Sequence, residues 1–241
     1  MIKISFLIII SLVLFSCNFI IPRHGPGELW TIHLLPTSGD WSSVTYGNGI
    51  FVAVAANSSS VVTSMDGKNW ITNTLPSSAP WSSITFGKGI FVVIANGTSA
   101  ATSIDGKNWN VGTLPYSGPW RSVAYGNGVF VAVNTDHTTS AALSSDGIHW
   151  TQQALPAGAY WNVVTYGNDI FVAFAFDDYK VVTSPDGINW TLIELPTYGW
   201  WMGLTYGNNI FVALDGLDEA TSEDGKNWNI RKLPESLGGN R

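Results

Sequence analysis

The chain of 241 residues is poor in charge and has a single cysteine. Charged residues make up 12% of it, and 11 Lys and Arg against 17 Asp and Glu leave a net charge of −6. Binding to nucleic-acid phosphates requires a basic face, so this balance excludes DNA or RNA as a partner. With Cys17 as the only cysteine, a disulfide within the chain is also excluded. Stability must therefore come from packing.

Long apolar runs are absent as well, apart from residues 4–15 near the start. Twelve residues are too few to span a bilayer but fit the h-region of a secretory signal. The stretch Leu14–Cys17 resembles a bacterial lipobox, in which the peptide is cut before the cysteine and the thiol is acylated. We expect a lipoprotein-type signal peptide at 1–16, a lipid on Cys17 and a tether at 17–28. An ordinary signal peptide with an incidental cysteine is the alternative.

These features predict a protein anchored by its lipid in the bacterial cell envelope. The outer membrane or the cell surface would display it, and a periplasmic position remains open. The lipid would be its only attachment to the membrane, and we expect a monomer.

What the chain does contain is a phrase, Ser-x-Asp-Gly-x-x-Trp, written five times. Its aspartates are spaced by 39, 41, 40 and 38 residues and are Asp66, Asp105, Asp146, Asp186 and Asp224. A period of about 40 residues is the signature of stacked or ring-closed repeats. Because these aspartates recur in every repeat, we interpret them as structural rather than catalytic.

Each repeat begins with a tryptophan followed by short apolar and β-branched runs separated by Gly, Asn and Asp turns. The repeats start near residues 41, 81, 120, 161 and 201. In the first repeat we predict strands at Trp41–Tyr46, Ile50–Ala55, Val61–Ser64 and Trp70–Leu75. Four-stranded antiparallel units of this length, repeated radially, indicate an all-β, five-bladed β-propeller over residues 29–235, with a tail at 236–241.

The phrase resembles the Asp-box of the BNR family of propellers, known from sialidases and from many non-catalytic proteins. The family form has one residue between aspartate and glycine, and here the glycine follows directly. The resemblance implies a structural turn between the third and fourth strands, remote from catalysis. A Ca²⁺ loop is the sharper alternative, but the additional acidic ligands are missing. We therefore predict no metal and no cofactor.

The segment at 29–35 is a surplus, because the Leu-Pro that ends each repeat occurs six times and the first copy is Leu35–Pro36. It resembles a fourth strand without a blade of its own. Such a strand could displace or flank Trp228–Leu233 at ring closure, or pair with another chain. We favour the intramolecular option because residues 36–40 lead directly into the first repeat.

Function is expected in the loops that do not repeat, which all lie on one face of a propeller. These are the loops between the fourth and first strands and between the second and third strands. The candidate binding residues there are Tyr116, Arg121, Asp136, His137, Tyr160, Asp177, Asp178, Tyr179, Tyr198, Trp200 and Asp218.

Catalysis is the less favoured hypothesis. The sialidase resemblance implies three arginines that converge on a substrate carboxylate, whereas only Arg121 is placed to reach a central cavity. A glycoside hydrolase would need two facing carboxylates. The acidic residues near enough are Asp177, Asp178, Asp215, Asp218 and Glu219, and we interpret them as a solvated acidic rim. We therefore predict no catalytic residue and no enzyme.

Binding is the favoured class, because aromatic platforms beside Asp and Asn acceptors suit sugar rings and protein partners alike. A lectin would place equivalent residues in several blades, and these loops differ from blade to blade. The sequence therefore favours a single composite site or a protein partner, and leaves the choice between a glycan and a protein open.

Overall fold

The computed structural model describes residues 33–233, which form nineteen β-strands. We call the five sequence repeats units 1 to 5. Units 1 and 2 contain β1 (Asp40–Gly47), β2 (Ile50–Ala56), β3 (Ser58–Ser64), β4 (Ile71–Ala79), β5 (Trp81–Gly87), β6 (Ile90–Ala95), β7 (Gly97–Ser103) and β8 (Asn110–Gly118). Units 3 to 5 contain β9 (Trp120–Gly126), β10 (Val129–Asn134), β11 (Thr138–Ser144), β12 (Thr151–Gly167), β13 (Ile170–Phe176), β14 (Asp178–Ser184), β15 (Thr191–Gly199), β16 (Gly203–Gly207), β17 (Ile210–Leu214), β18 (Asp218–Ser222) and β19 (Asn229–Lys232).

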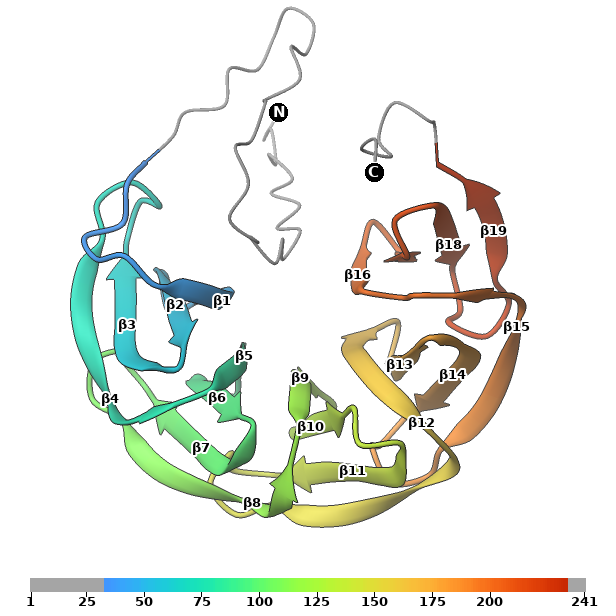
Figure 1. The fold of residues 1–241 in the computed structure, drawn as a ribbon, viewed down its shortest axis with the longest axis horizontal. Coiled ribbons are helices and arrows are strands. Elements are labelled where there is room, and N and C mark those ends of the chain that lie inside the picture. Colours follow the sequence, from blue (N-terminus) through green and yellow to red (C-terminus); the bar gives the residue numbers. More distant parts are fainter. Residues whose placement is uncertain (1–32, 234–241) are drawn as a thin grey trace, which may run out of the picture.

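The strands form antiparallel sheets placed radially about a centre, with β1, β5, β9 and β16 on the inside (Figure 1). This confirms the predicted all-β class and the four-stranded units. The separate fifth sheet is not seen: there are three four-stranded sheets and one of seven strands. Within residues 33–233 the arc is open between unit 1 and unit 5 (Figure 1).

The seven-stranded sheet arises because β12 runs without interruption from unit 3 into unit 4. Its first part pairs with β11, and its second part, from Tyr160, pairs with β13. At two other junctions the equivalent residue is Pro80 or Pro119, which has no N–H to donate to a ladder. Tyr160 has one and pairs with Phe176, and the strand continues. At the junction of units 4 and 5 the equivalent residue is Trp200, and there the strand ends at Gly199.

The predicted bounds of the third and fourth strands of unit 1 were wrong: the third begins at Ser58 rather than at Val61. The fourth strand of unit 1 begins after Trp70 and continues through Pro76 to Ala79, which pairs with Ser58 across a register shift. The surplus segment at 29–35 lies mostly outside the described residues. Its last three residues form no strand, and Leu34 is 87% exposed.

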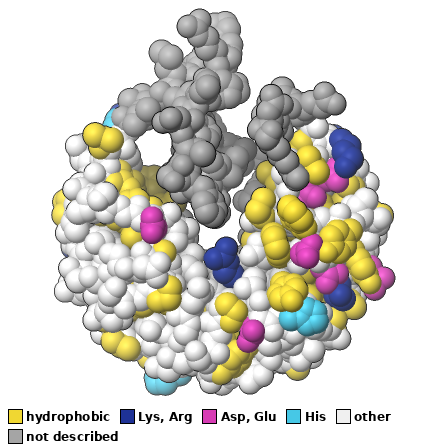
Figure 2. Space-filling view, in the orientation of Figure 1, with side chains coloured by type: hydrophobic (Ala, Val, Ile, Leu, Met, Phe, Trp, Pro, Cys, Tyr) yellow, Lys and Arg dark blue, Asp and Glu magenta, His cyan; other side chains and the backbone are white. Residues whose placement is uncertain are grey.

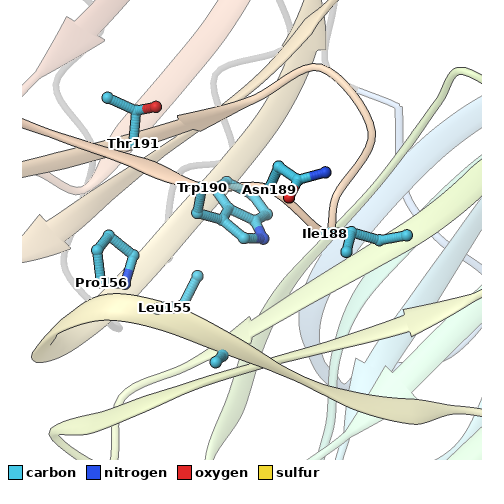
Figure 3. A pocket seen from close by; sticks show the side chains of 7 residues that line it. Leu155, Pro156, Ile188, Asn189, Trp190 and Thr191 are labelled. Carbon is cyan, nitrogen blue, oxygen red and sulfur yellow. The ribbon is translucent and has the colours of Figure 1, made fainter.

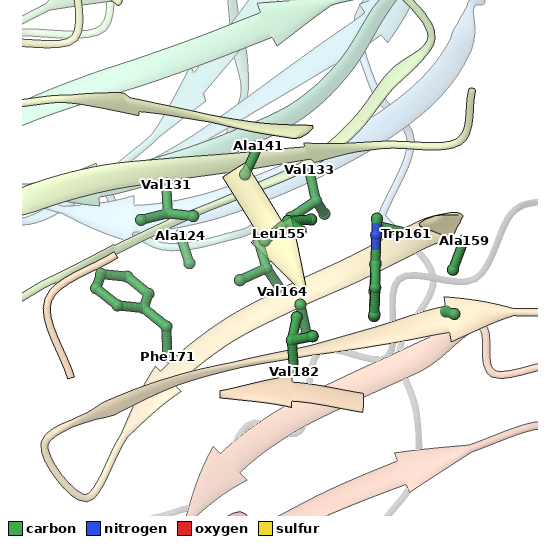
Figure 4. Packing of buried hydrophobic residues seen from close by; sticks show 12 residues of the cluster. Ala124, Val131, Val133, Ala141, Leu155, Ala159, Trp161, Val164, Phe171 and Val182 are labelled. Carbon is green, nitrogen blue, oxygen red and sulfur yellow. The ribbon is translucent and has the colours of Figure 1, made fainter. Parts of the chain in front are cut away.

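The core consists of apolar clusters between successive units rather than one central core. Between units 3 and 4, Val131 and Val133 of unit 3 meet Trp161, Val164 and Phe171 of unit 4 (Figure 4). The equivalent tryptophans at the other junctions, Trp81, Trp120 and Trp201, are likewise at most 1% exposed. Each can bury about 150–250 Å², so neighbouring units depend on each other for cover.

One contact between units recurs four times. An aromatic ring near the end of each inner strand lies on the glycine that ends the inner strand of the preceding unit. The pairs are Phe86 on Gly47, Tyr125 on Gly87, Tyr166 on Gly126 and Tyr206 on Gly167. A Cβ at these glycines would lie 1.9–2.1 Å from a ring carbon, so only glycine fits.

A second contact joins the hairpin turns to the repeated phrase of the next unit. The donors are side chains at equivalent turn positions: Asn48 Nδ2 to the carbonyl of Ile104, Lys88 Nζ to Ser145, Asn127 Nδ2 to Pro185 and Asn168 Nδ2 to Glu223, at 3.0–3.1 Å. Within residues 33–233, the next donor in the series, Asn208, and the first carbonyl, that of Met65, have no such partner. One end of the arc therefore has the donor of this contact, Asn208, and the other end has the acceptor, the Met65 carbonyl.

The repeated phrase forms a turn held by its aspartate. In unit 2, Asp105 Oδ1 accepts the N–H groups of Lys107 and Asn108 at 2.9 and 2.8 Å, and Ser103 Oγ donates to the same oxygen. The backbone bond from Asn108, followed by that from Lys107, holds the pKa of Asp105 well below its usual range. The glycine that follows has a φ of +69°, and Trp109 Nε1 donates to its carbonyl. The carboxylate therefore serves the turn.

Candidate functional site

Two kinds of loop meet on one face of the arc, which we call the variable face. In unit 4, Asp178 pairs with Gly199, which joins the turn between β13 and β14 to the connection after β15. In unit 3, Thr138 pairs with Ala159 and joins the corresponding two loops. The hairpins and the Ser-x-Asp-Gly-x-x-Trp turns lie at the opposite ends of the strands. This register confirms the prediction that the two sets of loops share a face.

The richest cluster on this face surrounds Asp177, in the turn between β13 and β14. Its Oδ1 accepts the indole N–H of Trp200 at 2.6 Å. Trp200 is stacked with Phe176 at 6.3 Å between ring centroids and an interplanar angle of 28°. A hydrogen bond between Tyr198 and Asp177, together with desolvation, raises the pKa of Tyr198 to about 12. Tyr198 and Trp200 stay 58% and 51% exposed, so their rings are fixed yet accessible.

Unit 3 repeats this arrangement at equivalent positions. His137 takes the place of Asp177, and Tyr160 takes that of Trp200. The two rings meet edge to face, 4.9 Å apart. Both turn residues adopt left-handed backbone, with φ of +48° for His137 and +56° for Asp177, which projects their side chains from a tight turn. Asp136, beside His137, is exposed.

Two of the candidate carboxylates are neutralised within the scaffold. Asp178 Oδ2 lies 2.7 Å from Lys180 Nζ, and that ammonium lies 5.2 Å from the centroid of the Tyr179 ring. Asp218 is 7% exposed, and its Oδ1 lies 2.9 Å from Lys232 Nζ. The expected solvated acidic rim is therefore corrected at these two positions, which form ion pairs.

Two further candidates belong to units 2 and 3. Tyr116 is half-buried: its ring lies 4.9 Å from that of Trp120, and its hydroxyl accepts a hydrogen bond from Asn134 at 2.7 Å. It therefore supports the scaffold. Arg121 is exposed on the inner strand β9, and no ion pair involves it within residues 33–233.

Sequence reasoning missed several residues of this face, namely Phe176, Lys180, Met202, Leu217 and Lys232. Lys180 lies three residues after Asp177 but forms its ion pair with Asp178, because side chains two residues apart on a strand lie on the same face. Met202 and Leu217 are exposed apolar side chains beside unit 5. Their positions in the sequence could have indicated them, because Met202 follows the junction of units 4 and 5 and Leu217 lies in the loop between β17 and β18.

The surface view shows where the apolar side chains gather. Yellow side chains mixed with acidic, basic and histidine side chains cover one half of the visible face, while the other half is mostly polar and uncharged (Figure 2). The exposed large apolar residues of the variable face all come from units 3 to 5: Tyr160, Tyr179, Tyr198, Trp200, Met202 and Leu217. We call these six residues the aromatic patch.

The hollows of the surface lie elsewhere. One groove of about 350 Å³ is lined by Leu155, Pro156, Ile188 and Trp190, between the outer strand of unit 3 and the repeated turn of unit 4 (Figure 3). A second, of about 650 Å³, lies against the turns of units 1 and 2 around Trp70. Both are lined by residues of the repeated turns and of the strands beside them. Among residues 33–233, no group of three or more His, Cys, Asp or Glu side chains is placed to hold a metal ion.

No family model and no curated protein matches the chain. Solved structures do. Catalytically inactive virginiamycin B lyase from Staphylococcus aureus with quinupristin has a TM-score of 0.75 at 15% identity, covering 84% of this chain and 73% of that chain. YCF48 bound to D1 peptide has a TM-score of 0.61 at 16% identity, covering 83% and 68%. The nidogen/laminin complex has a TM-score of 0.64 at 10% identity, covering 83% and 82%.

These likenesses concern the fold alone, because every identity is below 25%. They support a β-propeller fold for this chain. Residues 33–233 include no helix long and apolar enough to cross a membrane.

Proposed function

We propose that the protein is a non-enzymatic binding module that holds a partner on the variable face, with a protein as the first candidate and a glycan as the second. The observation that carries this proposal is the aromatic patch. A cluster of exposed large apolar side chains on a rigid scaffold marks an interaction site. Tyr and Trp are enriched among the hot-spot residues of protein interfaces, and both occur here.

A protein partner is favoured by the extent of the patch over three neighbouring units and by its absence from the other two. Two of the similar structures are of complexes, YCF48 bound to D1 peptide and the nidogen/laminin complex. A glycan is favoured by Trp200 and Asp177, because a flat ring beside a hydrogen-bond acceptor suits a sugar. Against hydrolysis stands the pairing of Asp178 and Asp218 with lysines, which engages two of the five candidate carboxylates.

We also propose that each unit is one blade of an Asp-box type propeller, which gives five blades. On this proposal β12 serves as the outer strand of the third blade and the inner strand of the fourth. Support comes from the pairing of its two parts with different partner strands and from the same contacts at all four junctions.

The test of the proposed function is a pair of variants, each removing one exposed apolar side chain. Trp200→Ala removes the centre of the patch, and Met65→Ala removes a side chain 82% exposed on the opposite face. Partners are captured from envelope extracts, and sugars are screened on a glycan array. We expect Trp200→Ala to weaken binding about thirtyfold, or 2 kcal/mol as for a hot-spot residue, and Met65→Ala to leave it unchanged. Equal binding by both variants would show that the partner is held elsewhere.

We further propose that the mature protein is lipid-anchored through Cys17, which lies outside the described residues. Replacing Cys17 with Ser should abolish labelling by fatty acid and move the protein from the detergent phase to the aqueous phase. One acyl chain binds membranes only marginally, so stable anchoring requires more than one. Unchanged partitioning of the variant would contradict the proposal.

A further inference from the structure

Asp177 differs from the nearby Asp178 and Asp218 in having no cationic partner among residues 33–233. Its neighbour Asp178 and the buried Asp218 each have a lysine within 2.9 Å. Asp177 is exposed, and no Lys, Arg or His among residues 33–233 forms an ion pair with it. Its hydrogen-bond donors, the Trp200 indole and the Tyr198 hydroxyl, are both neutral. The turn therefore presents a full negative charge to solvent, held in place by two aromatic side chains.

The Trp200 side chain beside Asp177 is held in place and remains half exposed. Phe176 covers one face of Trp200, and the side chain is still half exposed, so ring surface is left for a ligand. The hydrogen bond to Asp177 fixes the indole, so little side-chain freedom remains to be lost on binding. A cation over an aromatic face is attracted by the ring quadrupole, most strongly for Trp. Carboxylate and rings thus favour the same kind of ligand.

A second carboxylate, that of Asp215, lies close to the segment that contains the aromatic neighbours of Asp177. Asp215 lies next to the Tyr198–Trp200 segment: its Oδ2 is 2.8 Å from the position a Cβ would take on Gly199. It accepts the backbone N–H groups of Leu217 and Asp218 and has no cationic partner among the described residues. The nearby lysines, Lys180 and Lys232, are both engaged with other carboxylates. The local field is therefore negative and disfavours anionic ligands.

We propose that Asp177, Trp200 and Tyr198 bind the ammonium or guanidinium group of a Lys or Arg side chain presented by a protein partner. This inference rests on the proposed function, because it names the chemistry that the aromatic patch recognises. Asp177 supplies the opposite charge, Trp200 the cation–π surface and Tyr198 a second ring that holds the carboxylate. The aliphatic stem of the bound side chain lies along the remaining apolar residues of the patch.

The probe is a glycine-flanked pentapeptide with a central lysine, compared with the same peptide in which that lysine is acetylated. Both are titrated into the whole protein at low ionic strength while the ¹⁵N–¹H signal of the Trp200 indole is followed. We expect the lysine peptide to shift this signal and the acetylated peptide to bind at least fivefold more weakly. Equal shifts from the two peptides, or no shift from the lysine peptide, would overturn the proposal.

The matched variants are Asp177→Asn and Asp169→Asn. Both aspartates have left-handed backbone, with φ of +56° and +61°, and they lie beyond opposite ends of β13. Asparagine keeps the acceptor for the Trp200 indole and removes only the charge. We expect Asp177→Asn to weaken the lysine peptide at least fivefold and Asp169→Asn by less than twofold. If a captured partner depends on Trp200 yet binds Asp177→Asn normally, the proposed function stands and the cationic ligand is refuted.

Discussion

Gly126→Ala should lower the free energy of unfolding by about 3 kcal/mol, the upper part of the range for overpacked sites. The added Cβ would lie 2.0 Å from a carbon of the Tyr166 ring, which is itself held 4.8 Å from Phe171. The backbone at Gly126 is not left-handed, so the alanine itself is unstrained. The whole cost would therefore come from forcing two units apart. Urea denaturation measures it as a lower midpoint at unchanged slope.

The control is Gly203→Ala, in another inner strand. The nearest atom to its added Cβ is Leu214 Cβ at 4.0 Å, which is ordinary contact. This variant should be neutral or more stable by about 0.5 kcal/mol, because alanine restricts the unfolded chain. If both variants unfold alike, the aromatic–glycine contact does not join the units.

The repeating part of this structure could be predicted because the same residue pattern occurs in all five repeats. Five copies of a turn phrase fix where strands end, and the alternating residues between them fix which side chains are buried. The contact of Tyr166 with Gly126 escaped sequence reasoning although each repeat contains the aromatic–glycine pair. The two partners belong to different repeats, about 40 residues apart, and only the angle between sheets brings them together.

The shared strand β12 escaped for a local reason. Two equivalent junctions carry prolines, whereas Tyr160 supplies an N–H and pairs with Phe176, so the ladder continues. The expectation of a break came from the Leu-Pro ending, and a proline at the outer edge interrupts no hydrogen bond that the strand needs. The lack of a proline is not sufficient for the strand to continue, because the junction of units 4 and 5 carries Trp200 and its strand still ends at Gly199.

The candidate site was predictable as a face but not as a set of partners. Variable loops with aromatic residues indicated where to look. The different fates of Asp177 and Asp178, adjacent and chemically identical, depend on a left-handed turn residue followed by a strand residue. One carboxylate then points to Trp200, 23 residues away, and the other to Lys180. Sequence alone does not contain that orientation.

The ends of the arc offer the second large effect, through two tyrosines at equivalent positions. Tyr125 lies on Gly87 of the preceding unit, whereas Tyr46 is 55% exposed, and its only aromatic contact within residues 33–233 is Phe51 of its own sheet, at 4.7 Å. We expect Tyr125→Ala to cost about 3 kcal/mol, as for other large-to-small changes at packed aromatic sites. Tyr46→Ala should cost less than about 1 kcal/mol, because it removes a ring that is largely in water.

The comparison tests whether the arc is open in solution. Gly207, which ends the inner strand of unit 5, is the one glycine of its series left half-buried among the described residues, and it is the partner that Tyr46 would meet on closure. If the ring closed on itself, Tyr46 would take the place that Tyr125 takes, and the two alanine variants would lose equal stability at every protein concentration. If the end faces met between molecules, the loss at Tyr46 would grow with concentration. A small, concentration-independent loss is what the open arc requires.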